Sequence, residues 1–137
     1  MVNILVSGCG GAMGRTVIRA LQQQEDCALV GGLSPHPCPD LGVPVFEDWK
    51  SCRNFPDVRE PVDVIIDFSH PKALDGVAGL ALRDRKGVVL ATTGYTQEQT
   101  ARIEALAAEL PVFFSANMSV GVALMRELCV RAARVLG

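Results

Sequence analysis

A cluster of glycines directly after a short aliphatic run, close to the start of the chain, limits the possible folds more than any other feature. The run Val2–Ser7 contains neighbouring Ile, Leu and Val residues, which is typical of a buried strand. The segment Gly8–Arg15, with the sequence GCGGAMGR, follows it, and Met13–Gln24 has helical character. A strand that turns through glycines into a helix brings permissive backbone next to unpaired helix N–H groups, and together these favour a bound phosphate.

This strand, turn and helix match the phosphate-binding corner of a Rossmann unit, although the glycine spacing departs from the common G-x-G-x-x-G pattern. Met13 occupies the third glycine position of that pattern. The spacing Gly8-x-x-Gly11-x-x-Gly14 therefore describes the turn better. Taken alone, this spacing is also compatible with an ordinary glycine turn between a strand and a helix.

The size and charge of the chain narrow the class of protein. Its 137 residues fit one domain, and a net charge of −2 with a pI near 5.6 gives no general case for nucleic-acid binding. The five cysteines show no CxxC or Cys/His metal-binding spacing, so we expect reduced thiols and no metal site. No apolar run reaches the ~20 residues that span a bilayer, and Met1–Asn3 leaves no room for a signal peptide. We therefore expect a soluble, cytoplasmic protein.

The end of the second expected strand, Cys27–Gly32, bears on the choice of nucleotide. A Rossmann domain normally carries an acidic residue there that binds the adenosine ribose. The sequence has LSPHP at positions 33–37, with no acid and no Arg or Lys for a 2′-phosphate. Ser34 could hydrogen-bond either group, and His36 could contribute when protonated. A proline-stiffened surface loop is the alternative, so NADH and NADPH both stay open.

The remainder of the chain alternates between short aliphatic runs and helical periods. The alternation predicts a parallel sheet covered on both faces by helices, which is an α/β, Rossmann-type doubly wound fold in one domain over residues 1–137. Residues 35–61 form a long, proline-rich connection. The expected elements are strands at 27–32, 43–46, 64–66, 87–91 and 112–115, and helical segments at 48–53, 71–85, 96–110 and 121–136.

Apolar residues at helical spacing predict which side of each later helix is buried. Thr96 and Gln99 are also placed to form a capping box at the start of a helix. The residues expected to face inward are Leu74, Val77, Ala78, Ala81 and Leu82, then Ile103, Leu106, Ala107 and Leu110, and in the last helix Leu124, Leu128 and Val135.

Polar or glycine-rich loops follow four of the expected strands. They are Gly8–Gly14, Asp67–Pro71, Thr92–Tyr95 and Ala116–Gly121. Because ligands of such sheets bind outside the carboxyl ends of the strands, these loops predict a dinucleotide site. No Ser/His/Asp set, paired carboxylates or metal cluster accompanies them. Asp67 is the one acid/base candidate at this edge, and a lone Asp after a strand is more often structural, for example as a helix cap.

The same loops resemble the N-terminal domain of dihydrodipicolinate reductase (4-hydroxy-tetrahydrodipicolinate reductase), a family of bacterial lysine and diaminopimelate synthesis. The resemblance covers essentially the whole chain, and the TTG and ANxSVG segments together are specific to the family. The matching segments, in chain order, are GCGGAMGR at 8–15, DFSHP at 67–71, TTGY at 92–95 and ANMSVGV at 116–122.

The resemblance implies that Gly8–Met13 hold a pyrophosphate, while Ala91–Thr93 and Ser115–Met118 flank the nicotinamide and its ribose. The family's frequent ribose-binding acid is replaced by Ser34, an arginine by His70, and a basic residue beside the phosphates by Ala12. The residues implied to bind NADH or NADPH are Gly8, Cys9, Gly10, Gly11, Ala12, Met13, Ser34, Phe68, His70, Ala91, Thr92, Thr93, Ser115, Ala116, Asn117 and Met118.

The family's catalytic elements have no counterpart in this sequence. Its paired histidines, its lysine proton donor, its Ser-Gly-Thr substrate loop and the sheet of its homotetramer would all lie beyond Gly137. We therefore assign no catalytic residue and expect this chain alone to be inactive on the cyclic dicarboxylate substrate, which the missing domain would bind. A stand-alone NAD(P)-sensing module, or the nucleotide domain of another two-domain dehydrogenase, are the alternatives.

Overall fold

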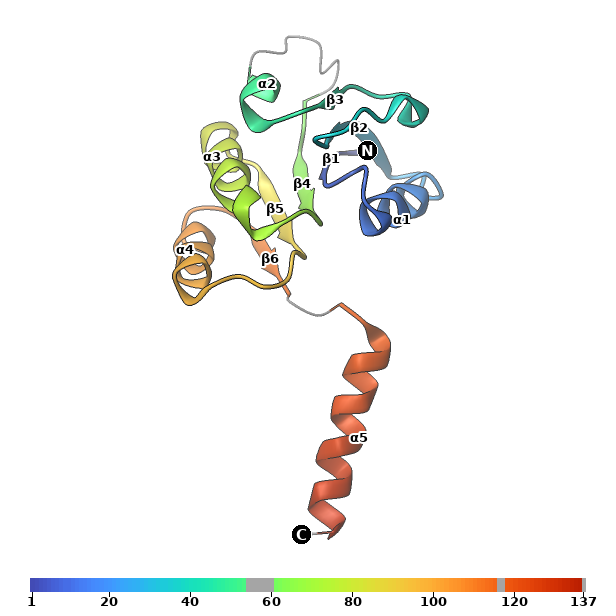
Figure 1. The fold of residues 1–137 in the computed structure, drawn as a ribbon, viewed down its shortest axis with the longest axis vertical. Coiled ribbons are helices and arrows are strands. Elements are labelled where there is room, and N and C mark those ends of the chain that lie inside the picture. The colour runs from blue at the N-terminus through green and yellow to red at the C-terminus, as the bar shows by residue number, and fades with distance from the viewer. Residues whose placement is uncertain (54–60, 116–117, 137) are drawn as a thin grey trace.

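The fold is built on a six-stranded, all-parallel sheet with the strand order β3-β2-β1-β4-β5-β6 (Figure 1). The computed structural model describes residues 1–53, 61–115 and 118–136. The strand order reverses beside β1, which places a topological switch point between β1 and β4. The strands are β1 Val2–Ser7, β2 Cys27–Leu33, β3 Val45–Phe46, β4 Val64–Asp67, β5 Gly87–Leu90 and β6 Val112–Phe114.

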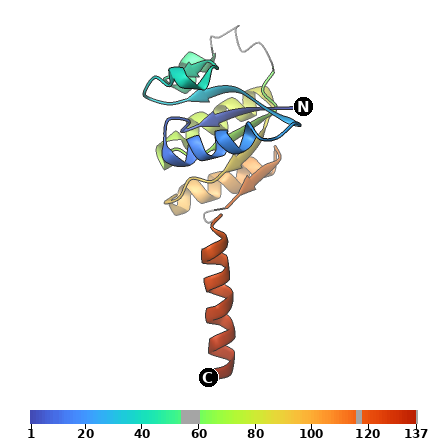
Figure 2. The same cartoon turned by 90° about the vertical axis from the view of Figure 1, so that its right-hand side faces the viewer.

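Helices cover both faces of the sheet, as the alternation predicts (Figures 1 and 2). Helix α1 lies on one face, and α3 and α4 lie on the other. The sequence prediction of a doubly wound α/β fold is confirmed. The helices are α1 Ala12–Leu21, α2 Trp49–Arg53, α3 Leu74–Asp84, α4 Gln97–Ala107 and α5 Val120–Leu136, with 3₁₀ turns η1 at Pro39–Leu41 and η2 at Pro71–Ala73.

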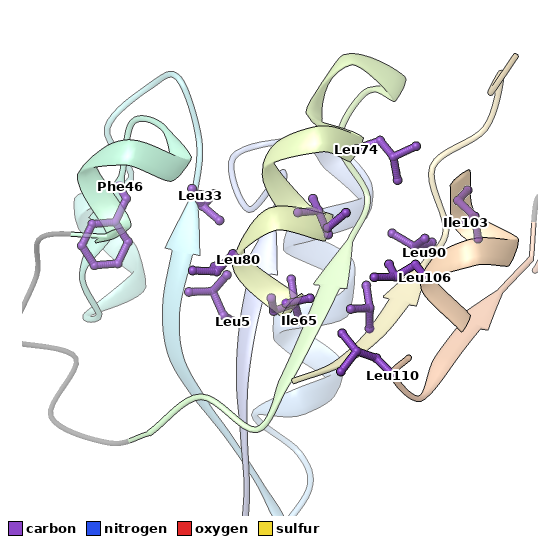
Figure 3. Packing of buried hydrophobic residues seen from close by; sticks show 14 residues of the cluster. Leu5, Leu33, Phe46, Ile65, Leu74, Leu80, Leu90, Ile103, Leu106 and Leu110 are labelled. Carbon is purple, nitrogen blue, oxygen red and sulfur yellow. The ribbon is translucent and has the colours of Figure 1, made fainter. Parts of the chain in front are cut away.

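Alternating residues of β1 pack into two separate hydrophobic cores, one on each face of the sheet. Ile4 and Val6 pack with Ile18 of α1 on one face. Leu5, which is fully buried, packs on the other face in a larger cluster that includes residues of α3 and α4 (Figure 3). Each large aliphatic side chain buried in this way contributes about 1.5–3 kcal/mol. The central strand is therefore fixed from both sides, and its carboxyl end is held rigidly.

The predicted capping box at the start of α4 is confirmed. The Thr96 hydroxyl accepts a hydrogen bond from the Gln99 backbone N–H at 3.2 Å, and the Gln99 side chain accepts one from the Thr96 N–H at 3.0 Å. A cap of this kind stabilises a helix by about 1 kcal/mol. It fixes where α4 begins and so fixes the loop between β5 and α4.

Three predictions of buried helix faces are wrong. Leu82 is 38% exposed and Ala107 is exposed, because both lie in the last turn of their helices. Helix α5 has no buried residue and extends away from the sheet (Figures 1 and 2). Its apolar positions therefore meet no surface of the described part of the chain. The exposed residues that were expected to be buried in α5 are Leu124, Leu128 and Val135. Among the described residues, no helix is long and apolar enough to cross a membrane.

Candidate functional site

The glycine turn between β1 and α1 is closely packed at two of its glycines. Gly8 has a φ of +80°, and a Cβ there would lie 2.5 Å from the Phe68 carbonyl oxygen. A Cβ at Gly14 would overlap the Gly8 carbonyl oxygen. Both positions therefore exclude side chains because the turn packs against the β4 loop and α1 packs against the turn.

Gly11 differs from these two glycines. It is exposed and has an ordinary φ of −78°, and a Cβ there would meet only the Gly8 carbonyl oxygen, at 3.3 Å. Gly11 is also the N-cap of α1, and no side chain caps this helix. The turn therefore offers open backbone beside the N-terminal N–H groups of a ten-residue helix, which suits an anion.

A first cavity, of about 600 Å³, lies on the β2 side of the turn, and we call it the β2-side cavity. It connects the ends of β2 and β3 with the connection between β4 and α3. Ser34 is 5% exposed, and its hydroxyl accepts a hydrogen bond from the His36 N–H at 3.1 Å. The lining residues are Ser7, Gly8, Leu33, Ser34, Pro35, Glu47, Asp48, Trp49, Ser69, His70, Lys72 and Ala73.

A second cavity, of about 420 Å³, lies on the other side of the turn, and we call it the β5-side cavity. The turn thus separates two hollows at the carboxyl edge of the sheet, one beside Gly8 and one beside Met13. The lining residues of the β5-side cavity are Met13, Phe68, Ser69, Ala91, Thr92, Thr93, Met118 and Ser119.

A larger cavity of about 840 Å³, between η2 and α4, includes none of the glycine turn in its lining. Its charges nearly cancel, because Lys72 and Arg102 face Asp75 and Glu98, and Arg102 binds Asp75 at 3.0 Å. Because its lining includes no residue of the glycine turn, this cavity offers a nucleotide no contact with that turn. The two cavities beside the turn are therefore the better candidate site.

Asp67 connects the loops that line the β5-side cavity. Its carboxylate is fully buried and accepts hydrogen bonds from the hydroxyls of Ser69 at 2.5 Å, Thr92 at 2.7 Å and Tyr95 at 3.4 Å. The Thr92 hydroxyl in turn accepts the Ser69 N–H at 3.0 Å. These bonds join the loops after β4 and β5. Asp67 does not reach solvent, so the structure gives it a positioning role rather than an acid/base role.

The helical turn after β4 is capped by a different residue from the one considered in the sequence. The His70 imidazole Nδ1, not Asp67, accepts the Lys72 backbone N–H at 3.2 Å at the start of η2. This fixes His70 with Nδ1 as an acceptor in this arrangement. The Asp67 carboxylate takes no part in this cap and instead accepts the hydroxyls of Ser69, Thr92 and Tyr95.

Tyr95 completes the network around Asp67. Burial, and then the neighbouring Asp67 carboxylate, raise the pKa of Tyr95 to about 12. The hydroxyl therefore stays protonated at neutral pH and acts as a donor. The Tyr95 ring also makes an edge-to-face contact with Phe114 of β6, with ring centroids 5.8 Å apart. Sequence reasoning placed Tyr95 in a loop but missed its hydrogen bond to Asp67, since that bond joins positions 28 residues apart.

The predicted cofactor residues fall into distinct groups in the structure. Nine line the two cavities, and Gly10, Gly11 and Ala12 lie exposed on the turn between them. Ser115 is half-buried, and its N–H donates to the Leu90 carbonyl oxygen at 3.1 Å. Ala116 and Asn117 lie outside the described residues. The nine that line a cavity are Gly8, Met13, Ser34, Phe68, His70, Ala91, Thr92, Thr93 and Met118.

Cys9 points away from this edge. Its side chain is fully buried beside Cys38, in the core that Ile4, Val6 and Ile18 form between the sheet and α1. Burial, and then the Cys38 thiol, raise the pKa of Cys9 to about 11. Only its backbone belongs to the turn, and its N–H donates to the Leu33 carbonyl oxygen at 3.1 Å. Sequence reasoning missed Glu47, Trp49, Ser69, Lys72 and Ser119, all of which line a cavity.

Sequence comparison finds 4-hydroxy-tetrahydrodipicolinate reductases among the relatives of this chain. The profile of the family described as "Dihydrodipicolinate reductase, N-terminus" matches residues 2–118. A 4-hydroxy-tetrahydrodipicolinate reductase from Caldanaerobacter subterraneus subsp. tengcongensis is 35% identical over 136 residues, covering 99% of this chain and 51% of the relative. One from Clostridium novyi is 36% identical over 128 residues, covering 93% and 48%. The chain thus spans about half the length of the curated relatives it matches.

Solved structures with the same fold include a reductase and a dehydrogenase. A dipicolinate-bound dihydrodipicolinate reductase from Paenisporosarcina sp. TG-14 superimposes with a TM-score of 0.74 at 26% identity, covering 97% of this chain and 54% of that one. A myo-inositol dehydrogenase from Lactobacillus casei, in complex with NAD(H) and myo-inositol, gives 0.64 at 21% identity, covering 96% and 42%. The second likeness shows the fold alone.

Proposed function

The chain belongs to the dihydrodipicolinate reductase family, whose N-terminal part it matches, and we propose that it is the nicotinamide-nucleotide-binding domain of a 4-hydroxy-tetrahydrodipicolinate reductase. Membership in this family of oxidoreductases implies a nicotinamide cofactor. The reductase activity of the whole protein, in lysine and diaminopimelate synthesis, is part of the proposal, as are the homotetramer and the cytoplasmic location. The dinucleotide-binding unit comprises residues 1–137.

One observation carries the proposal: the fold demands glycine less at Gly11 than at the other glycines of the turn. Gly8 and Gly14 are explained by packing within the chain, and a Cβ at Gly10 would lie 2.6 Å from the Ser34 hydroxyl oxygen. A Cβ at Gly11 would meet only the Gly8 carbonyl oxygen, at 3.3 Å, and the exposed backbone of Gly11 stands at the end of a helix that lacks a side-chain cap. A pyrophosphate needs such an approach of bare backbone.

The two cavities on either side of the turn would then hold the two ends of the dinucleotide. Gly8–Met13 would bind the pyrophosphate, the β2-side cavity the adenosine, and the β5-side cavity the nicotinamide with its ribose. When bound there, the nicotinamide would supply the hydride for reduction of a cyclic imine-type dicarboxylate. The contribution of this chain is orientation, because the Asp67 network fixes Ser69 and Thr92 in the wall of the β5-side cavity.

The described residues that line the β5-side cavity, where the nicotinamide would lie, include no ionisable acid. Asp67, which is buried and engaged by three hydroxyls, is not part of that lining. Substrate binding and proton donation are therefore assigned to the other half of the protein, and the chain alone is expected to reduce no substrate.

Replacing Gly11 with Val tests the proposal directly. The added side chain would occupy the space of the pyrophosphate, so binding of NADH and NADPH should fall by at least about 100-fold. The free energy of unfolding should fall by only about 1 kcal/mol, because of the tight contact with the Gly8 carbonyl oxygen and the poorer N-cap residue, so the chain stays folded. Isothermal titration calorimetry of the chain measures the first quantity, and urea denaturation followed by circular dichroism measures the second.

The matched control is Gly79→Val in α3, where a Cβ would meet nothing within 4 Å and no cavity of the candidate site is near. This variant should bind cofactor like the parent chain. Equal binding by Gly11→Val and the parent would show that the turn is not the pyrophosphate site.

A further inference from the structure

We propose that Glu47 contacts the adenosine end of the cofactor and makes the site select a nucleotide without a 2′-phosphate, NADH over NADPH. The inference rests on the proposed nicotinamide-nucleotide site and names which of the two cofactors it takes. The carboxylate that a Rossmann domain normally carries at the end of β2 would here be supplied by the neighbouring strand, β3.

The pairing of β2 with β3 brings Glu47 to this position. Leu33 and Phe46 are register partners, and the Ser34 N–H donates to the Phe46 carbonyl oxygen at 3.0 Å. Since the strands are parallel, the next residues, Ser34 and Glu47, stand next to each other at the carboxyl edge. Both line the β2-side cavity.

Ser34 is poorly placed to accept hydrogen bonds from a ribose. Its side chain is 5% exposed, and its hydroxyl oxygen already accepts the His36 N–H at 3.1 Å. The Glu47 side chain, in contrast, is exposed, and none of the ion pairs within the described residues involves it. A carboxylate offers acceptors to both ribose hydroxyls, which the buried Ser34 hydroxyl does not.

The charges of the β2-side cavity disfavour a 2′-phosphate beside Glu47. Asp48 stands beside Glu47, and its carboxylate accepts the Ser51 N–H at 2.7 Å at the start of α2. Hydrogen bonds from Ser51 lower the pKa of Asp48, so it is a second negative charge at neutral pH. A phosphate monoester placed near two carboxylates is repelled.

Among the described residues that line the cavity, two carboxylates outnumber the single lysine, and Lys50, whose positive charge acts on Asp48, does not line it. Residues 34–38 contain no Lys or Arg, and Arg15 of α1 is paired through both terminal guanidinium nitrogens with Asp40, at 2.5 and 3.3 Å. Lys72 belongs to the opposite wall, on the connection between β4 and α3. NADH and NADPH carry the same pyrophosphate, so the contacts at the 2′ position decide between them.

Titration of the chain with NADH and with NADPH, at low salt and pH 7.5, tests the inference. The parent chain should bind NADH at least about tenfold more tightly than NADPH. Glu47→Gln should bring the two dissociation constants to within about threefold, mainly by improving NADPH binding, and Glu47→Arg should reverse the preference. The parent ratio should shrink as salt is added, because the repulsion is screened.

Glu25→Gln is the matched control, since Glu25 is exposed in the turn before β2, at the opposite edge of the sheet. The ratio of the dissociation constants of this variant for NADPH and NADH should equal that of the parent chain. If both cofactors bind but the ratio is unchanged in Glu47→Gln, or if the parent prefers NADPH, Glu47 is not the selecting residue and the proposed function stands. If neither cofactor binds at millimolar concentration, the proposed function itself is overturned.

Discussion

The two halves of the sheet's carboxyl edge are built by opposite means. On the β1–β3 half, the site is shaped by bare backbone at Gly8, Gly11 and Gly14, and its charged side chains are exposed. On the β4–β6 half, the loops are held by side chains that converge on the buried Asp67 carboxylate. The first half is therefore sensitive to atoms that are added, and the second half is sensitive to atoms that are removed.

The largest expected effect comes from adding atoms to the first half at Gly14. A side chain there would overlap the Gly8 carbonyl oxygen, so Gly14→Val forces α1 away from the turn. We expect the free energy of unfolding to fall by about 3 kcal/mol or more, with loss of cofactor binding. Urea denaturation followed by circular dichroism measures the change. Unfolding at the same urea concentration as the parent would show that the turn is not packed as described.

Removing atoms from the second half should have an intermediate effect. Asp67→Asn replaces an acceptor of three hydroxyl donors with an amide, and the free energy of unfolding should fall by about 1–3 kcal/mol. Because Asp67 fixes the wall of the β5-side cavity, affinity for NADH should fall by roughly tenfold, while affinity for ADP, which lacks both the nicotinamide and its ribose, should stay unchanged.

Calorimetric titration with both ligands separates positioning from general damage. Thr92→Val, which removes the Thr92 hydroxyl from the same network, should reproduce the pattern. An equal loss of affinity for NADH and ADP would mean that Asp67 merely stabilises the fold.

The smallest expected effect is that of Tyr95→Phe, which removes the longest bond to Asp67, at 3.4 Å. The pKa of Tyr95 is raised from 10.0 to about 12, so its contribution to stability is complete below pH 10 and is lost as pH rises through 12. At pH 7 the variant should lose about 0.5–1 kcal/mol or less. Between pH 10 and 12 its stability should decline less steeply than that of the parent, as measured by urea denaturation at each pH. Parallel pH curves would contradict the raised pKa of Tyr95 and so its burial beside Asp67.

The fold was predictable because its signals are local. Aliphatic runs, glycine turns and the Thr96 capping box each lie within a few residues of one another, and their alternation requires a parallel sheet. The exposure of α5 was not predictable. Helical periodicity shows that a helix has an apolar side, as α4 and α5 both do, but it does not show what that side contacts.

The candidate site was predictable only in part, for a related reason. The glycine turn and the loops after β4 and β5 follow long or well-marked strands, so their positions at the carboxyl edge could be inferred. Glu47 follows a strand of two residues inside a proline-rich connection, and its register against β2 carries no sequence signal. The sequence left Asp67 with both an acid/base and a structural interpretation, because its partners Ser69, Thr92 and Tyr95 depend on how separate loops meet.

The central position of β1 has a consequence for the order in which the molecule forms. The strand pairs with β2 along one edge, and with β4 along the other, where Ile4 lies beside Val64. During synthesis the β1–β2–β3 ribbon can assemble from the first 46 residues, but the second edge of β1 stays open until β4 emerges. An open edge of aliphatic β-structure can pair with other chains, so this interval is when the growing chain is most prone to aggregate. The pocket walls that β4 and β5 provide arise only after that edge has closed.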